Sequence, residues 1–120
     1  MAEVTYNTEN LLVKDWKTYT GNIKAGTYHR GQLLVNDSGL WEDADDFDGS
    51  LQLGVYLGTV ETDNIPKTYT SNAWDAIIVF GEIYAGGLVN ASGNVLSLTE
   101  AQIGILQQSG IFMKKVYNGN

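Results

Sequence analysis

The densest group of potential metal ligands is the acidic run at residues 42–49, Glu-Asp-Ala-Asp-Asp-Phe-Asp-Gly. Carboxylates are the hard oxygen ligands that calcium prefers. An EF-hand loop needs acids at positions 1, 3 and 5, glycine at 6 and glutamate at 12. Counted from Asp43, these requirements fail at Phe47, Asp48 and Gly54. The pattern predicts a solvated acidic loop and no metal site, with weak calcium binding as the alternative.

Two further residues have the chemistry for general acid–base catalysis. His29 is the only histidine and stands beside Arg30, where we expect a surface or interface role. Glu82 follows an apolar run, and burial raises the pKa of a carboxyl unless it is paired. Catalysis by two carboxylates also needs a second acid, and no spacing identifies one. We therefore expect Glu82 to have a structural partner, Arg30 or a backbone amide.

The aromatic residues are the third candidate group. Trp16, Trp41, Trp74 and the 7 tyrosines could form a platform that stacks on sugars. Most of them stand inside or at the end of apolar stretches, which favours core or subunit contacts.

Composition excludes several classes of function. The chain has no cysteine, which rules out disulfides and thiol nucleophiles, and a single histidine leaves most zinc sites short of ligands. Seven scattered basic residues against 14 acidic ones give a net charge of −7, which argues against nucleic-acid binding. The longest apolar run, residues 76–80, is far shorter than the roughly 20 residues of a membrane span. The N-terminus has no signal-peptide pattern. We expect a soluble protein of 120 residues without cofactors.

The elements that would position these residues are mostly short strands. Asn36 to Gly39 is a turn by composition, so residues 32–41 predict a hairpin. Apolar residues alternate from Leu51 to Leu57, and residues 74–84 predict a central strand. Residues 61–72 read as a polar loop, and residues 111–117 as a last strand.

One helix is predicted at about residues 99–109. Thr99 and Gln102 fit a capping box, and Gly110 is a stop signal. We expect a β-rich α+β fold, a small barrel- or sandwich-like domain over residues 23–120. Residues 1–22 are polar and predict an extended N-terminal arm, flexible in the free protein, with an ordinary first strand as the alternative.

The order of these segments resembles the head decoration proteins of tailed bacteriophages, of the lambda type. The resemblance covers about residues 23–115, and the segment around residues 62–72 departs from it. The matching segments, in chain order, are Ala25-Gly26, Arg30-Gly31-Gln32-Leu33-Leu34, Trp41, Asp48-Gly49, Leu53-Gly54-Val55-Tyr56-Leu57, residues 76–82 ending in Gly-Glu, Leu106, and Ser109-Gly110-Ile111.

The resemblance implies a structural role without catalysis. Such proteins bind the outer surface of the expanded head as trimers, stabilise it against genome pressure, and are made in the host cytoplasm. The implied partners are the major capsid protein and two further copies of the chain, with no nucleic acid, membrane or cofactor. The N-terminal arm would dock on the capsid by β-augmentation. The candidate residues are Leu11, Leu12, Val13 and Trp16 for the capsid, and Tyr28, Arg30, Trp41 and Trp74 for the trimer interface.

Two alternatives remain open. A monomeric carbohydrate-binding β-sandwich module would present an exposed planar row of Trp and Tyr. A small hydrolase would place Glu82 at the floor of a deep cleft beside an aspartate.

Overall fold

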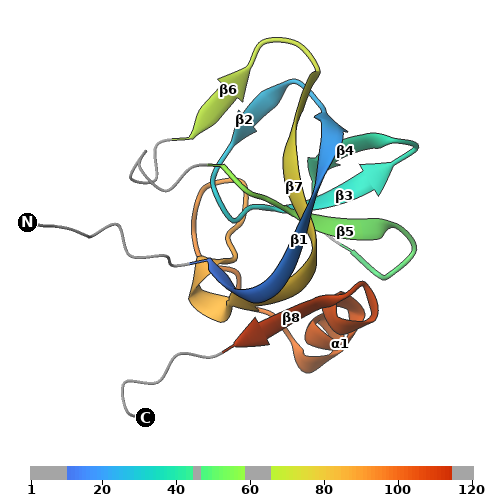
Figure 1. Cartoon of the computed structure of the whole chain (residues 1–120), viewed down its shortest axis with the longest axis vertical. Helices are drawn as coiled ribbons and strands as arrows, with labels where there is room; N and C mark the ends of the chain where they lie inside the picture. The colour runs from blue at the N-terminus through green and yellow to red at the C-terminus, as the bar shows by residue number, and fades with distance from the viewer. Residues whose placement is uncertain (1–10, 45–46, 59–65, 115–120) are drawn as a thin grey trace, which may run out of the picture.

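The computed structural model describes residues 11–44, 47–58 and 66–114. Within these ranges most residues lie in strands and one segment is α-helical, which confirms the predicted β-rich α+β class (Figure 1). The elements are β1 (Leu12–Ile23), β2 (Gly26–Tyr28), β3 (Leu33–Asp37), β4 (Leu40–Asp43), β5 (Gln52–Tyr56), β6 (Lys67–Tyr69), β7 (Ala73–Tyr84), the 3₁₀ helix η2 (Ala85–Gly87), α1 (Glu100–Gln108) and β8 (Ile111–Lys114). No helix in these ranges is long and apolar enough to span a membrane.

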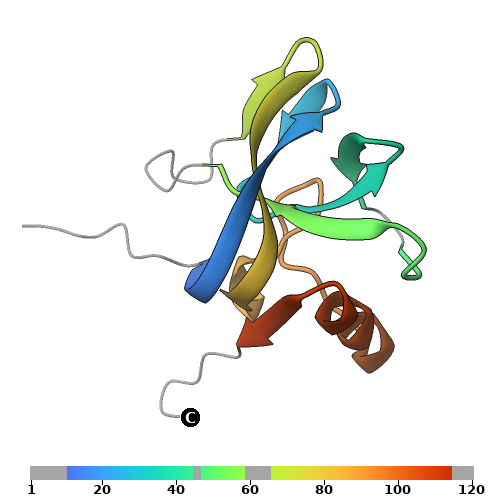
Figure 2. The same cartoon turned by 45° about the vertical axis from the view of Figure 1, so that its right-hand side comes forward.

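The two longest strands, β1 and β7, form an antiparallel ribbon that runs from Leu12 opposite Ile83 to Ile23 opposite Ala73. β1 also pairs with β4, and β4 connects through β3 and β5 back to β7. The main sheet therefore closes into a barrel in the order β1-β4-β3-β5-β7. β8 pairs in parallel with β7, outside this ring. Figures 1 and 2 show the coiled β1–β7 ribbon crossing the molecule, with β8 and α1 beside its lower end.

Trp41 fills the inside of the barrel, with only 1% of its surface exposed. Gly21 and Gly54 lie against its ring. A Cβ at Gly21 would be 2.6 Å from Trp41 Nε1, and one at Gly54 would be 2.7 Å from Trp41 Cζ3. Atoms do not pack that closely, so the indole occupies the space that side chains would need at both positions. The other four barrel strands contribute the buried residues Ile23, Leu34, Tyr56 and Ile77 to the same cluster.

A second core covers the outer face of the barrel. Successive residues of a strand point to opposite faces, so Leu33 and Val35 pack outside while Leu34 packs inside. α1 covers this outer face through Leu106, and β8 covers it through Ile111. The predicted helix is confirmed together with its capping box: the Gln102 amide donates to Thr99 Oγ1 at 3.2 Å, and the Thr99 amide donates to Gln102 Oε1 at 3.0 Å.

The predicted hairpin is also confirmed, as β3 and β4. Its turn places Ser38 and Gly39 at φ of 57° and 94°, and the Gly39 amide donates to Asn36 Oδ1 at 2.7 Å. Backbone in this region favours glycine and short polar residues, which is why composition identified the turn. The predicted strands at residues 51–57 and 74–84 correspond to β5 and β7.

Two expectations about segments are wrong. The polar loop predicted at residues 61–72 contains β6, which pairs with β2; its Lys-Thr-Tyr sequence is too short to show a period. The described part of the predicted arm, residues 11–22, belongs to the sheet rather than to a separate segment. β1 is held by backbone pairing with β7, which tolerates the polar side chains that suggested an arm. Residues 1–10 lie outside the described part of the chain.

Three tyrosines join the β2–β6 pair to the barrel. The ring centroid of Tyr28 lies 5.7 Å from that of Tyr56 and 5.9 Å from that of Tyr69. The Tyr56 and Tyr69 hydroxyls are 2.7 Å apart, and the Tyr69 hydroxyl donates to the Asp75 carboxylate. Burial opposes ionisation of Asp75. The Tyr69 hydroxyl, the Ala76 amide and the Lys67 ammonium outweigh that effect and hold the pKa of Asp75 below its usual value.

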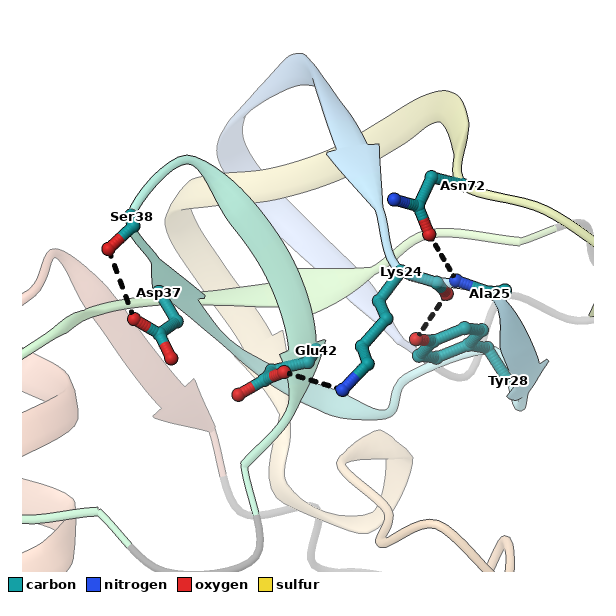
Figure 3. A network of polar contacts seen from close by, with 7 residues as sticks. All are labelled: Lys24, Ala25, Tyr28, Asp37, Ser38, Glu42 and Asn72. Carbon is teal, nitrogen blue, oxygen red and sulfur yellow. Dashed lines mark hydrogen bonds and ion pairs between the residues drawn. The ribbon is translucent and has the colours of Figure 1, made fainter.

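Figure 3 shows how the chain between β1 and β2 is fixed. The Tyr28 hydroxyl donates to the carbonyl of Lys24 at 2.7 Å, and the Ala25 amide donates to Asn72 Oδ1 at 2.9 Å. The ammonium of Lys24 lies 3.4 Å from Glu42 on β4. Polar groups of Lys24, Ala25 and Tyr28 at this end of the barrel are therefore paired within the chain.

The packing of Trp41 gives the first prediction. Gly54→Ala introduces a methyl group against Trp41 and Ile77, and overpacking of this kind costs about 1–3 kcal/mol. Gly104→Ala is the matched control, because Gly104 lies in α1 with open space around its Cα, and alanine there gains about 0.5–1 kcal/mol. Urea unfolding followed by tryptophan fluorescence measures both. Equal effects of the two substitutions would contradict the packing described above.

The lowered pKa of Asp75 gives the second prediction. A carboxyl whose pKa falls on folding stabilises the fold above its unfolded pKa, and that stabilisation disappears as pH falls through the folded pKa. We expect the free energy of unfolding to decline below about pH 4, and Asp75→Asn to remove part of that decline. Asp37→Asn, in the exposed β3–β4 turn, should leave the decline intact. Urea unfolding of both variants across the acid range measures this decline. Identical pH profiles for the two variants would contradict its assignment to Asp75.

Candidate functional site

The described surface has one face on which exposed aromatic rings and lysines gather. It lies at the end of the β1–β7 ribbon and on β8. Cross-strand register places Lys17 beside Phe80, and Lys14 beside Glu82, which in turn lies beside Phe112. Alternate residues of a strand share a face, so Lys114 joins Phe112. We call Lys14, Lys17, Phe80, Phe112 and Lys114 the lysine–aromatic face. Trp16 lies beside it in the chain, with its backbone against Gly81.

Two large aromatic side chains on this face and one beside it are open to solvent. Phe80 is 42% exposed, Phe112 41% and Trp16 44%. The rings of Phe80 and Phe112 meet edge to face, with centroids 6.2 Å apart. Lys14, Asp15 and Glu82 line a hollow of about 290 Å³ together with these two rings. Neighbouring exposed aromatic rings around a hollow are typical of a surface that another molecule covers.

A β-bulge shapes this end of the ribbon. The pairing of β1 with β7 shifts register between Leu12 and Lys14 and again between Lys14 and Lys17. Asp15, inside the bulge, has a φ of 57°, in the left-handed region that few non-glycine residues adopt. Opposite it, a Cβ at Gly81 would overlap the backbone of Trp16. Glycine at position 81 therefore lets the bulged strand lie close to β7, which fixes where Trp16 leaves the sheet.

The lysines of this face differ from the other described lysines. Lys24 lies 3.4 Å from Glu42, and Lys67 lies 3.6 Å from Asp75. Lys14, Lys17 and Lys114 make no ion pair within the described ranges, although Glu82 stands opposite Lys14 in register. In a chain of net charge −7, these three ammonium groups remain available to an external partner.

The four residues predicted for the capsid contact differ in how far they are buried. Leu11 is 1% exposed and packs in the outer core. Leu12 and Val13 are half-buried, and Trp16 is exposed. Leu11 thus anchors the start of the described chain, and among the four candidates Trp16 is the one whose side chain is open to a partner.

The four residues predicted for the trimer interface also differ in how far they are buried. Trp41 and Tyr28 are 1% and 4% exposed. They have no surface to offer to a second chain, so their assignment to an interface is wrong. Arg30 is half-buried and lines a hollow of about 340 Å³ with His29 and Gly93. Trp74 is 68% exposed and remains a candidate.

The catalytic candidates do not form a deep cleft. Glu82 and Asp15 line the same open hollow on the ribbon surface, beside Lys14 rather than at the floor of a cleft. The expected ion pair between Glu82 and Arg30 is absent from the described residues. In the acidic loop, Asp48 is exposed and accepts from the Ser50 amide at 2.9 Å. No group of three metal-ligating side chains comes together among the residues that the structure describes.

The aromatic rings also do not form a row. Phe80 and Phe112 are inclined at 80°, so the two rings do not make one flat surface. Trp74 stands six residues before Phe80 on β7, which separates the two by about 20 Å. The sequence indicated the aromatic residues but not their clustering. Phe80, Phe112 and the lysines were missed because their proximity depends on the β1–β7 and β7–β8 register.

Comparison of the chain with protein-family models, with curated proteins and with solved structures finds no match.

The charge of the lysine–aromatic face gives the third prediction. Iodide and caesium ions quench exposed tryptophans by contact, so their relative efficiency reports the local charge. Trp74→Phe leaves Trp16 as the exposed emitter, and Trp16→Phe leaves Trp74; Trp41 is the shielded background in both. We expect iodide to be favoured over caesium more strongly in Trp74→Phe than in Trp16→Phe. The same preference in both variants would show that the face is not more positive than the surface around Trp74.

Proposed function

We propose that this chain is a structural decoration protein that binds the outer surface of an expanded bacteriophage head as a homotrimer and stabilises it. The observation that carries the proposal is the lysine–aromatic face, a surface of two exposed aromatic rings and three lysines that make no ion pair with the described residues. Its partner is the major capsid protein. The role requires no catalysis, cofactor, nucleic acid or membrane.

The positions of the first and last described residues support a docking role for this end of the barrel. Leu12 lies opposite Ile83, and Ile83 lies opposite Met113. The first residues of β1 and the last residues of β8 therefore flank β7 at the same end of the molecule (Figure 1). Residues that precede Leu11 and follow Lys114 are connected to the fold beside the lysine–aromatic face, so they and the face can engage one partner.

Symmetry supports the function physically. A trimer presents each contact three times, so three weak contacts act together on a shell of matching symmetry. The net charge of −7 keeps the free protein soluble before assembly. For the contact between copies, Arg30 and Trp74 remain the candidates with accessible surface.

Co-sedimentation with expanded, decoration-free phage capsids tests this function and is the fourth prediction. We expect saturable binding in multiples of three chains per local threefold position. A chain lacking residues 1–10 should bind more weakly, because those residues are joined to the fold beside the docking face. A chain in which ten alternating glycine and serine residues replace residues 1–10 is the control for shortening. Residues 12–22 stay in both variants, because they form β1.

The opposite result is equally specific. Failure of the complete chain to bind any expanded capsid tested, with retention on a polysaccharide column instead, would refute the decoration role and favour a carbohydrate-binding module.

A further inference from the structure

We infer that the lysine–aromatic face binds an extended, acidic segment of the capsid protein, with an apolar side chain of that segment in the hollow between Phe80 and Phe112. This inference rests on the proposed decoration function and adds to it the chemistry of the partner.

The first argument is charge. The face contains two acidic residues, Asp15 and Glu82. It also contains three basic residues, Lys14, Lys17 and Lys114. The face is therefore net positive on a chain whose total charge is −7. The described lysines elsewhere, Lys24 and Lys67, are already paired with carboxylates. A positive surface whose ammonium groups pair with no described carboxylate favours an acidic partner, and the surrounding negative charge of the protein disfavours other docking positions for it.

The second argument is the apolar part of the hollow. Phe80 lies against Gly110, where an added Cβ would be 2.7 Å from the ring. Phe112 meets Phe80 edge to face. The Gly110 contact supports Phe80 from behind, and each ring still exposes about two-fifths of its surface, 42% and 41%. A supported, exposed aromatic pair can bury one apolar side chain without rearranging, which keeps the entropic cost of binding low.

The third argument is the free edge of β8. β8 is the last strand in the sheet order, and β7 is its one strand partner within the described ranges. Its far edge can therefore pair with an added strand, which is the usual way in which a sheet edge binds an extended peptide. A strand added there runs past Phe112 and Lys114, so main-chain pairing, aromatic contact and charge contact act on the same segment.

The positions of the first and last described residues indicate which partner covers the lysine–aromatic face. The residues before Leu11 and after Lys114 are joined at this end of the barrel. The proposed function puts the N-terminal residues on the capsid, so the adjacent face meets the capsid as well. The residues proposed for the contact between copies, Arg30 and Trp74, are not part of this face. The favoured occupant is therefore the capsid protein rather than a second copy.

The test, which is the fifth prediction, compares two variants of the complete chain with the same change in net charge. Lys14→Gln, Lys17→Gln and Lys114→Gln together remove three positive charges from the face. Gln52→Glu, Ser71→Asp and Ser38→Asp together add three negative charges at exposed positions away from it. In capsid co-sedimentation, we expect the lysine variant to bind at least about tenfold more weakly and with a smaller salt dependence, and the control to stay within about threefold of the unmodified chain.

The apolar contact is tested in the same assay. Phe112→Ala should weaken capsid binding, and Trp74→Ala, which removes an exposed aromatic side chain on another part of the surface, should not. Thermal unfolding of each variant separates loss of binding from loss of fold.

A probe experiment tests the acidic specificity without capsids. A synthetic peptide of alternating Glu and Phe is titrated into the ¹⁵N-labelled full chain, with a Lys–Phe peptide as the control. We expect chemical-shift changes at residues 12–17, 80–84 and 111–114 with the acidic peptide alone, and their loss in the lysine variant.

The outcomes separate the inference from the function it rests on. Capsid binding that survives in the lysine variant would overturn the inference and leave the decoration role intact. Absence of capsid binding by the unmodified chain would refute the decoration role, and with it the capsid as occupant. Peptide shifts away from the face would refute its acidic specificity. A lysine variant that loses self-association but keeps capsid binding would assign the face to a second copy, against the inference.

Discussion

The structure depends on the burial of one indole ring. Trp41 occupies the inside of the barrel because Gly21 on β1 and Gly54 on β5 leave room for it. Those two strands approach the ring from different directions, and Ile77 of β7 packs in the same cluster. The ring thus holds β1, β5 and β7 at a fixed separation around β4. Any larger side chain at either glycine would force the strands apart, so closure of the barrel and burial of Trp41 are one constraint.

The functional surface follows from that closure. With β1 held against β7, the ribbon continues beyond the barrel, and β8 joins it there. The bulge at Asp15 and the glycine at position 81 turn the end of the ribbon so that Trp16 lies over β7. The lysines and phenylalanines come from three strands far apart in sequence, and the register alone brings them together. At the opposite end, Tyr69 is hydrogen-bonded to Asp75 and Lys24 is paired with Glu42.

Local sequence signals predicted local structure well. The Asn36–Gly39 turn, the capping box at Thr99 and the alternation in β5 each report on a few neighbouring residues, and each is confirmed. A barrel was one of the two architectures that the sequence predicted, because short strands with many glycines favour closed sheets. β6 was missed because three residues show no periodicity.

Residue roles that depend on distant pairing were not predictable. Trp41 was expected at the trimer interface that the resemblance implies, but its burial is set by glycines 20 and 13 positions away in the chain. β1 was expected to be an arm because its side chains are polar, whereas its place in the sheet comes from backbone pairing with β7. Trp16 and Trp74 were the candidates whose large exposure suits contact with another chain.

Hydrogen–deuterium exchange of the protein bound to expanded capsids, compared with the free protein, tests the central claim that the lysine–aromatic face is the docking surface. Amides of β8 and of the first half of β1 should gain protection on binding, because their free edges and side chains contact the partner. Protection confined to the β2–β6 end of the barrel, with unchanged exchange in β8 and β1, would contradict the account.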